Sequence, residues 1–375
     1  MMNFTLLLGA TVPRPAPTEI IDALQDIEIS YNLGQRSGFR ITFGYERVEL
    51  LDLLDSSLLR SSMLQLFNRV MVVLTLNARP IVLLDGIITQ HEVLPSEEPN
   101  ESRVVLMGED VSVMMDLEEK SVLHVAQTEA IIAAKIIASY TRYGLIPKVI
   151  PPPVIEALLP ITRIPSQQET DLAYLRTMAD RFDYIFHIQP GPLPGSNQAY
   201  WGPAVLPGVP QPALTYNMGS FSNVTSLSVR QNGLMPTQVK GQHQDRKSNR
   251  IQPIRNQRSR RPPLARDRAL IHQTKIRTTQ YRQGGSTASQ ATAIAQGQLE
   301  TASRQAVTLS GSLDTQIYGA VLEVGKLVGV RGLGATHDGI YYVQQVTHQV
   351  AEGVFTQQFE LAREGTGTIA PIVRV

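Results

Sequence analysis

Alternation of apolar and polar residues with a period of two constrains this chain most, because a strand with one buried face produces that pattern. Near the N-terminus, five short stretches alternate in this way or are rich in Val, Ile and Leu: residues 27–31, 39–43, 70–76, 81–93 and 103–107. Turn-forming residues separate them, as at Asn77–Pro80. The pattern predicts antiparallel strands over residues 26–116, interrupted by a helical patch at 50–59, and favours a small barrel or sandwich.

A second strand-rich region covers residues 307–363 and resembles the first. Asp85-Gly86 begins a long predicted strand near the N-terminus, and Asp338-Gly339 begins another here. In both places a turn and a further strand follow. Two copies of one structural unit would explain this echo. Asp-Gly pairs are common in hairpins, however, so two unrelated β domains are the alternative.

Between these two regions, the spacing of apolar residues changes from that of a strand to that of a helix. Apolar residues spaced for a helix occur between Val125 and Tyr140, and residues 166–169 match a capping box in which Ser166 would begin a second helix. An aromatic strand is predicted at residues 184–188. This order of elements predicts a small α/β unit.

Together these patterns predict an α+β fold that is mainly β, with two similar antiparallel β-barrel domains and a small α/β insertion between them. The chain is 42% hydrophobic, which is enough to bury several cores. The expected boundaries are a first β-barrel domain at 1–120, an α/β domain at 121–200, a connector with a basic loop at 201–305, and strands completing the second β-barrel domain at 306–375.

Charge is unevenly distributed, although the formal net charge is only +1. Residues 240–282 hold thirteen Lys and Arg against two Asp, so this segment carries +11 and the rest of the chain −10. Tyr281 is its only aromatic residue, which argues against stacking on bases, although binding of nucleic-acid phosphates remains an alternative. We interpret the segment as an exposed loop that contacts a neighbouring subunit or lines a channel. The candidate interface residues are Arg255, Arg258, Arg260, Arg261, Arg266 and Arg268.

The sequence contains no recognisable catalytic or metal-binding motif. Cysteine is absent, and the seven histidines are scattered without an HExxH pattern. Carboxylates cluster at Glu109-Asp110 and at residues 116–119, which a cell-wall-degrading hydrolase could use, but strand ends and a helix start explain them better. We therefore expect no enzyme activity, no cofactor and no metal. We also expect no membrane insertion, because no apolar stretch approaches the roughly 20 residues of a spanning helix.

Three sequence motifs occur in an order that is typical of one protein family. Residues 168–180 followed by the strand at 184–186 form one motif, with matching positions Glu169, Asp171, Leu172, Leu175, Tyr184 and Phe186. The C-terminal strands form another, with matching positions Asp338, Gly339, Tyr341, Val343 and His348. Asp85 and Gly86 match in the first strand region. These motifs resemble the phage late control protein D family and the N-terminal part of VgrG spike proteins. Asp183 departs from the pattern, because the family often has Gly near this position.

The resemblance covers most of the chain outside residues 190–300 and implies a structural baseplate hub of a contractile phage tail or contractile injection system. Hubs of this family are homotrimers in which each subunit supplies two similar barrels. Six barrels then meet the hexameric tail tube protein, while true threefold symmetry faces the trimeric spike protein. Other baseplate proteins are further implied partners. Assembly in the cytoplasm and incorporation into a tail or tail-like particle are expected.

Overall fold

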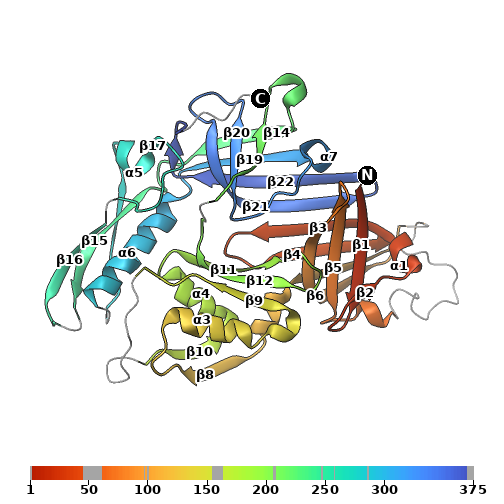
Figure 1. Cartoon of the computed structure of the whole chain (residues 1–375), viewed down its shortest axis with the longest axis horizontal. Coiled ribbons are helices and arrows are strands. Elements are labelled where there is room, and N and C mark those ends of the chain that lie inside the picture. Colours follow the sequence, from red (N-terminus) through yellow and green to blue (C-terminus); the bar gives the residue numbers. More distant parts are fainter. Residues whose placement is uncertain are drawn as a thin grey trace.

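The computed structural model describes residues 2–44, 61–96, 98, 101–153, 164–205, 208–245, 248–256, 258–284 and 287–369. The helical patch predicted at 50–59 lies outside these residues. The chain is mainly β, as predicted, and its largest sheet has 13 strands that form one continuous surface. In Figure 1 this sheet runs from the blue C-terminal strands to the red and orange N-terminal strands, and the yellow-green α/β elements lie below it.

The N-terminal β unit (residues 2–115) contains most of the strands predicted from alternation. Its strands are β1 (Met2–Gly9), β2 (Arg14–Pro15), β3 (Leu24–Asn32), β4 (Gly38–Gly44), β5 (Arg69–Leu76), β6 (Arg79–Leu94) and β7 (Arg103–Asp110). Short helices join them: α1 (Thr18–Asp22), η1 (Ser62–Leu64) and η2 (Val111–Met115). Every second residue faces one core, where Ile27, Ile41, Leu74 and Leu106 are almost completely buried.

The C-terminal β unit (residues 211–231 and 307–363) is assembled from two separate parts of the chain. Its strands are β13 (Gln211–Thr215), β14 (Ser226–Gln231), β19 (Val307–Asp314), β20 (Leu327–Arg331), β21 (Gly339–Ala351) and β22 (Val354–Arg363). Short helices η4 (Gly219–Phe221) and α7 (Thr315–Tyr318) join them. Its own core contains Leu309, Val328, Tyr341 and Phe359.

The two β units share one strand order. Numbered by their order along the chain, and leaving out the two-residue β2, the six strands of each unit lie side by side as 1-4-5-6-3-2. This is β1-β5-β6-β7-β4-β3 in the N-terminal unit and β13-β20-β21-β22-β19-β14 in the C-terminal unit. One difference is that β1 is antiparallel to β5, whereas β13 is parallel to β20. Asp85-Gly86 and Asp338-Gly339 therefore mark equivalent fifth strands, although Asp85-Gly86 lies inside β6 and does not begin it, as was predicted.

Direct strand pairing joins the two β units into one sheet. β21 pairs antiparallel with β3, in a register that runs from Gln345 opposite Asn32 to Ala351 opposite Asp26. The predicted closed barrels are not seen among the described strands, because β2, β13 and β14 each pair with only one other strand and so form open edges. Closure requires the edge strands of one unit to pair with each other, whereas here β3 pairs with the other unit.

The α/β unit (residues 119–203) packs against the N-terminal β unit. It consists of β8 (Glu119–Leu123), α3 (Glu129–Ala138), η3 (Thr141–Tyr143), β9 (Leu145–Val149), β10 (Ser166–Thr170), α4 (Asp171–Asp180), β11 (Tyr184–Pro190) and β12 (Asn197–Pro203). The prediction that Ser166 begins a helix is wrong. Residues 166–170 pair with β8 as a strand, and Thr170 caps α4 by accepting a hydrogen bond from the Ala173 N–H at 3.2 Å.

The basic segment is not a loop, and this prediction is also corrected. It contains β15 (Thr237–Gln244), β16 (Ile251–Asn256), β17 (Asp267–Arg268), α5 (Ala269–His272) and β18 (Arg277–Gln280), and β15 and β16 pack on α6 (Ala288–Ser303). We name residues 237–303 the basic unit. Its core contains Val239, Ile254 and Leu299. The sequence did not predict these strands, because each places only a few apolar residues, such as Val239 and Ile254, against α6. The outward positions carry polar or basic residues such as Lys240 and Arg255. A two-residue strand, β23 (Gly365–Thr366), pairs with β17.

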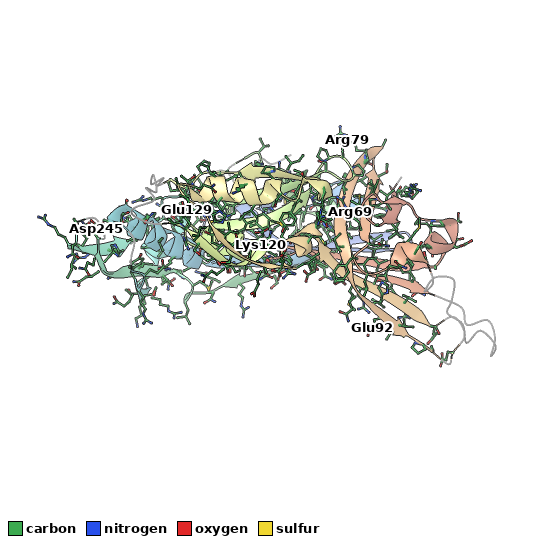
Figure 2. The ribbon with its side chains drawn as sticks, turned by 90° about the horizontal axis from the view of Figure 1, so that it is seen from below. Arg69, Arg79, Glu92, Lys120, Glu129 and Asp245 are labelled. Atoms are coloured by element: carbon green, nitrogen blue, oxygen red, sulfur yellow. The ribbon has the colours of Figure 1, made fainter. Side chains whose placement is uncertain are left out.

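A buried ion pair ties the N-terminal β unit to the α/β unit. Arg69 donates to both carboxylate oxygens of Asp85, at 2.6 and 2.7 Å, and both side chains are almost fully buried. Arg69 Nη2 also donates to the Tyr143 carbonyl at 2.8 Å, and the Asn197 side-chain amide donates to Asp85 at 2.8 Å. Figure 2 shows Arg69 beside the yellow α/β elements and Arg79 at the far end of the orange strands.

We predict that Arg69→Met lowers the free energy of unfolding by about 3–5 kcal/mol, because it leaves a buried carboxylate without its cation. Chemical denaturation of the purified chain measures this. Arg79→Met is the matched control, since Arg79 is exposed, and it should change stability by less than about 0.5 kcal/mol. Equal effects of the two substitutions would show that the buried pair does not hold the units together.

Candidate assembly surface

One face of the large sheet is polar and crosses from one β unit to the other. Its outward positions alternate with the core positions on six adjacent strands, β14-β19-β22-β21-β3-β4. The polar face consists of Ser226 and Ser228, Ser310 and Ser312, Gln358 and Glu360, Gln345, Thr347 and Gln349, Glu28 and Ser30, and Arg40. Ser, Thr and Gln predominate, so the face carries little charge and almost no apolar surface.

Side-chain hydrogen bonds run across the strands of this polar face. Ser30 and Thr347 share one at 3.0 Å across the junction of the two β units. Gln349 Nε2 donates to Glu28 at 3.4 Å, and Gln358 Nε2 donates to the Gln349 side chain at 3.2 Å. Such cross-strand pairs add to the stability of the sheet across the junction of the two β units. At its edge, no described strand pairs with the outer side of β14.

Beneath the polar face, His348 lies at the junction of the two β units. It is 2% exposed, and its ring contacts those of Tyr31 and Phe355 at centroid distances of 6.0 and 5.8 Å. Burial lowers the pKa of His348 to about 3, because the charged imidazolium is poorly solvated there. The residue therefore acts as a neutral packing group that contacts strands of both units.

The glycines of the two Asp-Gly pairs have related structural roles. A side-chain carbon on Gly86 would lie 2.8 Å from the Phe39 ring, and one on Gly339 would lie 2.6 Å from the Arg363 guanidinium. Gly339 also has a φ of 139°, which other residues rarely adopt. Each glycine thus leaves room for a large side chain of a neighbouring strand. Asp338 accepts a hydrogen bond from the Leu333 N–H at 2.8 Å.

Arg363 connects the remaining residues of the C-terminal motif. Its fully buried guanidinium lies 4.2 Å from the centroid of the Tyr341 ring and donates to the Asp338 carbonyl at 3.1 Å. The Tyr341 hydroxyl donates to the His337 carbonyl at 2.7 Å, and Val343 is buried in the core. These positions form the scaffold under the polar face.

The α/β motif likewise places its residues in a core and at a buried polar cluster. Leu172, Leu175, Tyr184 and Phe186 lie together in the core of this unit. Asp171 accepts hydrogen bonds from Lys120 at 2.5 Å, Gln167 at 2.7 Å and Tyr140 at 2.8 Å. Burial acts to raise the pKa of Asp171, but these donors hold it below its usual value. Glu169 lies at the rim, where it accepts a 3.4 Å hydrogen bond from Thr177.

Asp183, the departure from the family pattern, adopts the left-handed conformation that glycine would supply. Its φ is 57°, in the region that Asp and Asn tolerate better than most residues. Burial raises the pKa of its carboxyl, and Arg304 and Arg261 act against this. Asp183 pairs with Arg261, and with Arg304 at 3.1 Å, so it connects the α/β unit to the basic unit.

The six candidate arginines are not one surface. Arg261 is committed to Asp183, Arg266 pairs with Asp267 at 3.0 Å on the surface, and Arg268 lies on β17. Arg255, Arg258 and Arg260 are exposed, and no ion pair is found for them among the described residues. Arg255 lies opposite Lys240 on the outer face of the three-stranded sheet β16-β15-β18. Of the six arginines, Arg255 alone lies within this sheet, because β16 ends at Asn256.

No protein-family model and no curated protein matches this sequence. Solved structures match it over almost its whole length. A tail protein from Neisseria meningitidis MC58 is 13% identical, with a TM-score of 0.66 and 97% of both chains covered. The 43 kDa tail protein of prophage MuSo2 from Shewanella oneidensis is 11% identical, with a TM-score of 0.67 over 97% of this chain and 99% of that one. This chain has the fold of phage tail proteins.

The tail-protein fold extends to VgrG. A chain of the Francisella PdpA–VgrG complex is 7% identical, with a TM-score of 0.58, and the match covers all of this chain and 60% of that one. The resemblance read from the three sequence motifs is therefore confirmed at the level of the fold. Among the described residues, no helix is long and apolar enough to cross a membrane.

Sequence analysis did not find the polar face, although a signal for it was present. Ser226 and Ser228, and likewise Ser310 and Ser312, are spaced two apart and so share one side of a strand. These serines form one surface only because β14 pairs with β19, and the sequence around each pair does not reveal which strands will pair. The motifs found from sequence instead identified the scaffold residues.

We predict that acid weakens the junction of the β units through His348. Its pKa is below the usual 6.5, so the unfolded chain binds a proton that the folded chain does not, and stability falls as the pH drops from 6.5 toward about 3. His348→Phe should remove up to about 1.4 kcal/mol per pH unit of this dependence. His187, whose pKa is lowered to about 4 by burial and by Lys148, should leave a residual slope. Denaturation between pH 7 and pH 4 measures the difference.

His91→Gln provides the control, because His91 is exposed on β6. Its pH dependence of stability should match that of the parent chain. If His348→Phe also matched the parent, the buried neutral histidine would not be the source of the acid sensitivity.

Proposed function

We propose that this chain is a non-enzymatic structural hub of a contractile tail baseplate. It would be a trimeric adaptor that joins the hexameric tail tube to the trimeric spike. The observation that carries the proposal is the strand order 1-4-5-6-3-2, which occurs twice in one chain. Three copies of a chain with two related β units present six related surfaces, which is the number that a sixfold tube requires.

The fused sheet supports the same function, because it fixes the geometry between the two β units. Seven residue pairs connect β21 to β3, so the units cannot rotate freely about a linker. A symmetry adaptor needs this rigidity, since its two halves must meet two equivalent sites on a partner at once. The division into two barrel-like domains, an α/β insertion and a connector forms part of this proposal.

In this assembly, the polar face lines the central channel, and the exposed basic residues contact an acidic neighbour. A wall of Ser, Thr and Gln offers neither large apolar patches nor strong charge to a passing polymer, so it would not retain it. The outer face of the basic unit, with Lys240 opposite Arg255, offers a cationic surface that suits a carboxylate-rich partner.

We predict a multiple of three copies in native mass spectrometry of the chain purified with its spike partner. Cyclic symmetry shared with a trimeric spike is the physical reason. A stable dimer that binds the spike would contradict the proposal. The chain alone provides the reference measurement.

The channel assignment can be tested by cysteine labelling, because the chain contains no cysteine. Ser310→Cys places one thiol on the polar face, and Ser248→Cys places one on the exposed turn between β15 and β16. In assembled particles, we expect Cys at 310 to react with a small maleimide but at least tenfold more slowly with a large polymer-linked maleimide. Cys at 248 should react with both. Equal access of the large reagent to both positions would place the polar face outside the channel.

A further inference from the structure

A cavity of about 120 Å³ lies where the basic unit, the C-terminal β unit and the connection after β12 meet. Its walls are largely apolar and include Pro262, Leu264, Leu270, Ile271 and Leu327. A single water needs roughly 10–15 Å³ of such space, so the cavity has room for a group of several heavy atoms. The tail-hub proposal makes no use of this cavity.

Four polar atoms on the cavity wall are buried without a hydrogen-bond partner among the described residues. They are Arg261 Nη1, Arg304 Nε, Ser303 Oγ and Tyr342 Oη. Ser303 is 4% exposed and Tyr342 is 1% exposed. Buried donors without acceptors are costly, and four around one cavity are more than native proteins usually tolerate. All four can donate a hydrogen bond.

The carboxylates around the cavity already accept hydrogen bonds from other groups. Glu300 accepts from the Arg260 N–H at 2.8 Å and from the Ser259 hydroxyl at 2.6 Å. Glu364 accepts from the backbone N–H groups of Leu264 and Ala265 at 2.6 and 3.0 Å. The carboxylate of Asp183 is held by Arg261, Arg304 and Thr301. The Ser303 and Tyr342 hydroxyl oxygens can themselves accept, and Tyr342 interacts with Arg304. The cavity nevertheless offers more donors than acceptors, so a ligand that brings acceptors suits it.

We propose that this cavity binds a small aliphatic carboxylate. The carboxylate would accept hydrogen bonds from Ser303, Tyr342 and the two guanidinium groups, and its short alkyl chain would lie against Leu270, Ile271 and Leu327. Charge-assisted bonds from guanidinium to carboxylate are stronger than bonds between neutral groups, so an acid is preferred to an alcohol of the same length. Because its walls come from separate units, the bound ligand stiffens their junction.

The test uses hexanoate as the probe and 1-hexanol as its neutral counterpart, with the full chain and ligand-observed NMR. We expect saturable binding of hexanoate that is at least tenfold tighter than that of hexanol. Ser303→Ala and Tyr342→Phe each remove one donor and should weaken hexanoate binding by roughly tenfold. Circular dichroism confirms that both variants are folded.

Ile271→Trp fills the cavity and should abolish binding. Ile271 is 44% exposed, so the larger side chain is tolerated by the fold. Ile317→Trp is the matched control, because Ile317 is an exposed isoleucine on α7, away from the cavity, and should bind hexanoate normally. The proposal is overturned if the folded parent chain does not bind hexanoate, if hexanol binds equally well, or if Ile271→Trp binds like Ile317→Trp.

Discussion

The pairing of β21 with β3 is the interaction on which the rest of the structure depends. It connects residues more than three hundred positions apart and turns two β units into one sheet. The cores are joined in the same place, since Val346 packs in the C-terminal core while Val350 and Phe355 pack in the N-terminal core. Contacts of such long range form only after the entropy of closing a very large loop has been overcome. The N-terminal β unit therefore gains the strand next to β3 only when β21, near the end of the chain, has folded against it.

The other junctions are built from buried charge. The Arg69–Asp85 pair of the N-terminal β unit bonds to the α/β unit through the Tyr143 carbonyl and the Asn197 amide. Asp183 with Arg261 and Arg304 connects the α/β unit to the basic unit. Buried pairs add little net stability, but removing one partner is expensive, so they favour one relative placement of the units over others. Part of the positive charge of the basic unit, that of Arg261, is therefore used in this buried pairing with Asp183. Lys240 and Arg255 lie opposite each other on its outer face.

Identities of 11 and 13% with tail proteins of the same fold show how little sequence this architecture requires. Strand alternation, a few glycines at close approaches and an occasional buried charge are sufficient, and many residues satisfy each demand. Fold alone does not establish function. The proposed hub function rests instead on two features of this chain, the strand order that its two β units share and the polar face that crosses both of them.

The sequence by itself determined several local elements and their approximate positions: five strands of the N-terminal β unit, the strand-rich region at residues 307–363, the echo of Asp85-Gly86 in Asp338-Gly339, and the motifs that resemble the late control protein D family. Only the tertiary structure decided that β15, β16 and β18 form a sheet under α6, that Thr170 rather than Ser166 caps α4, and that the described strands of the large sheet do not close into barrels. Periodicity is a property of neighbouring residues, so it reveals a strand and its buried side. The choice of partner strand depends on hydrogen bonds and packing between residues far apart in the chain, and no local pattern contains that choice.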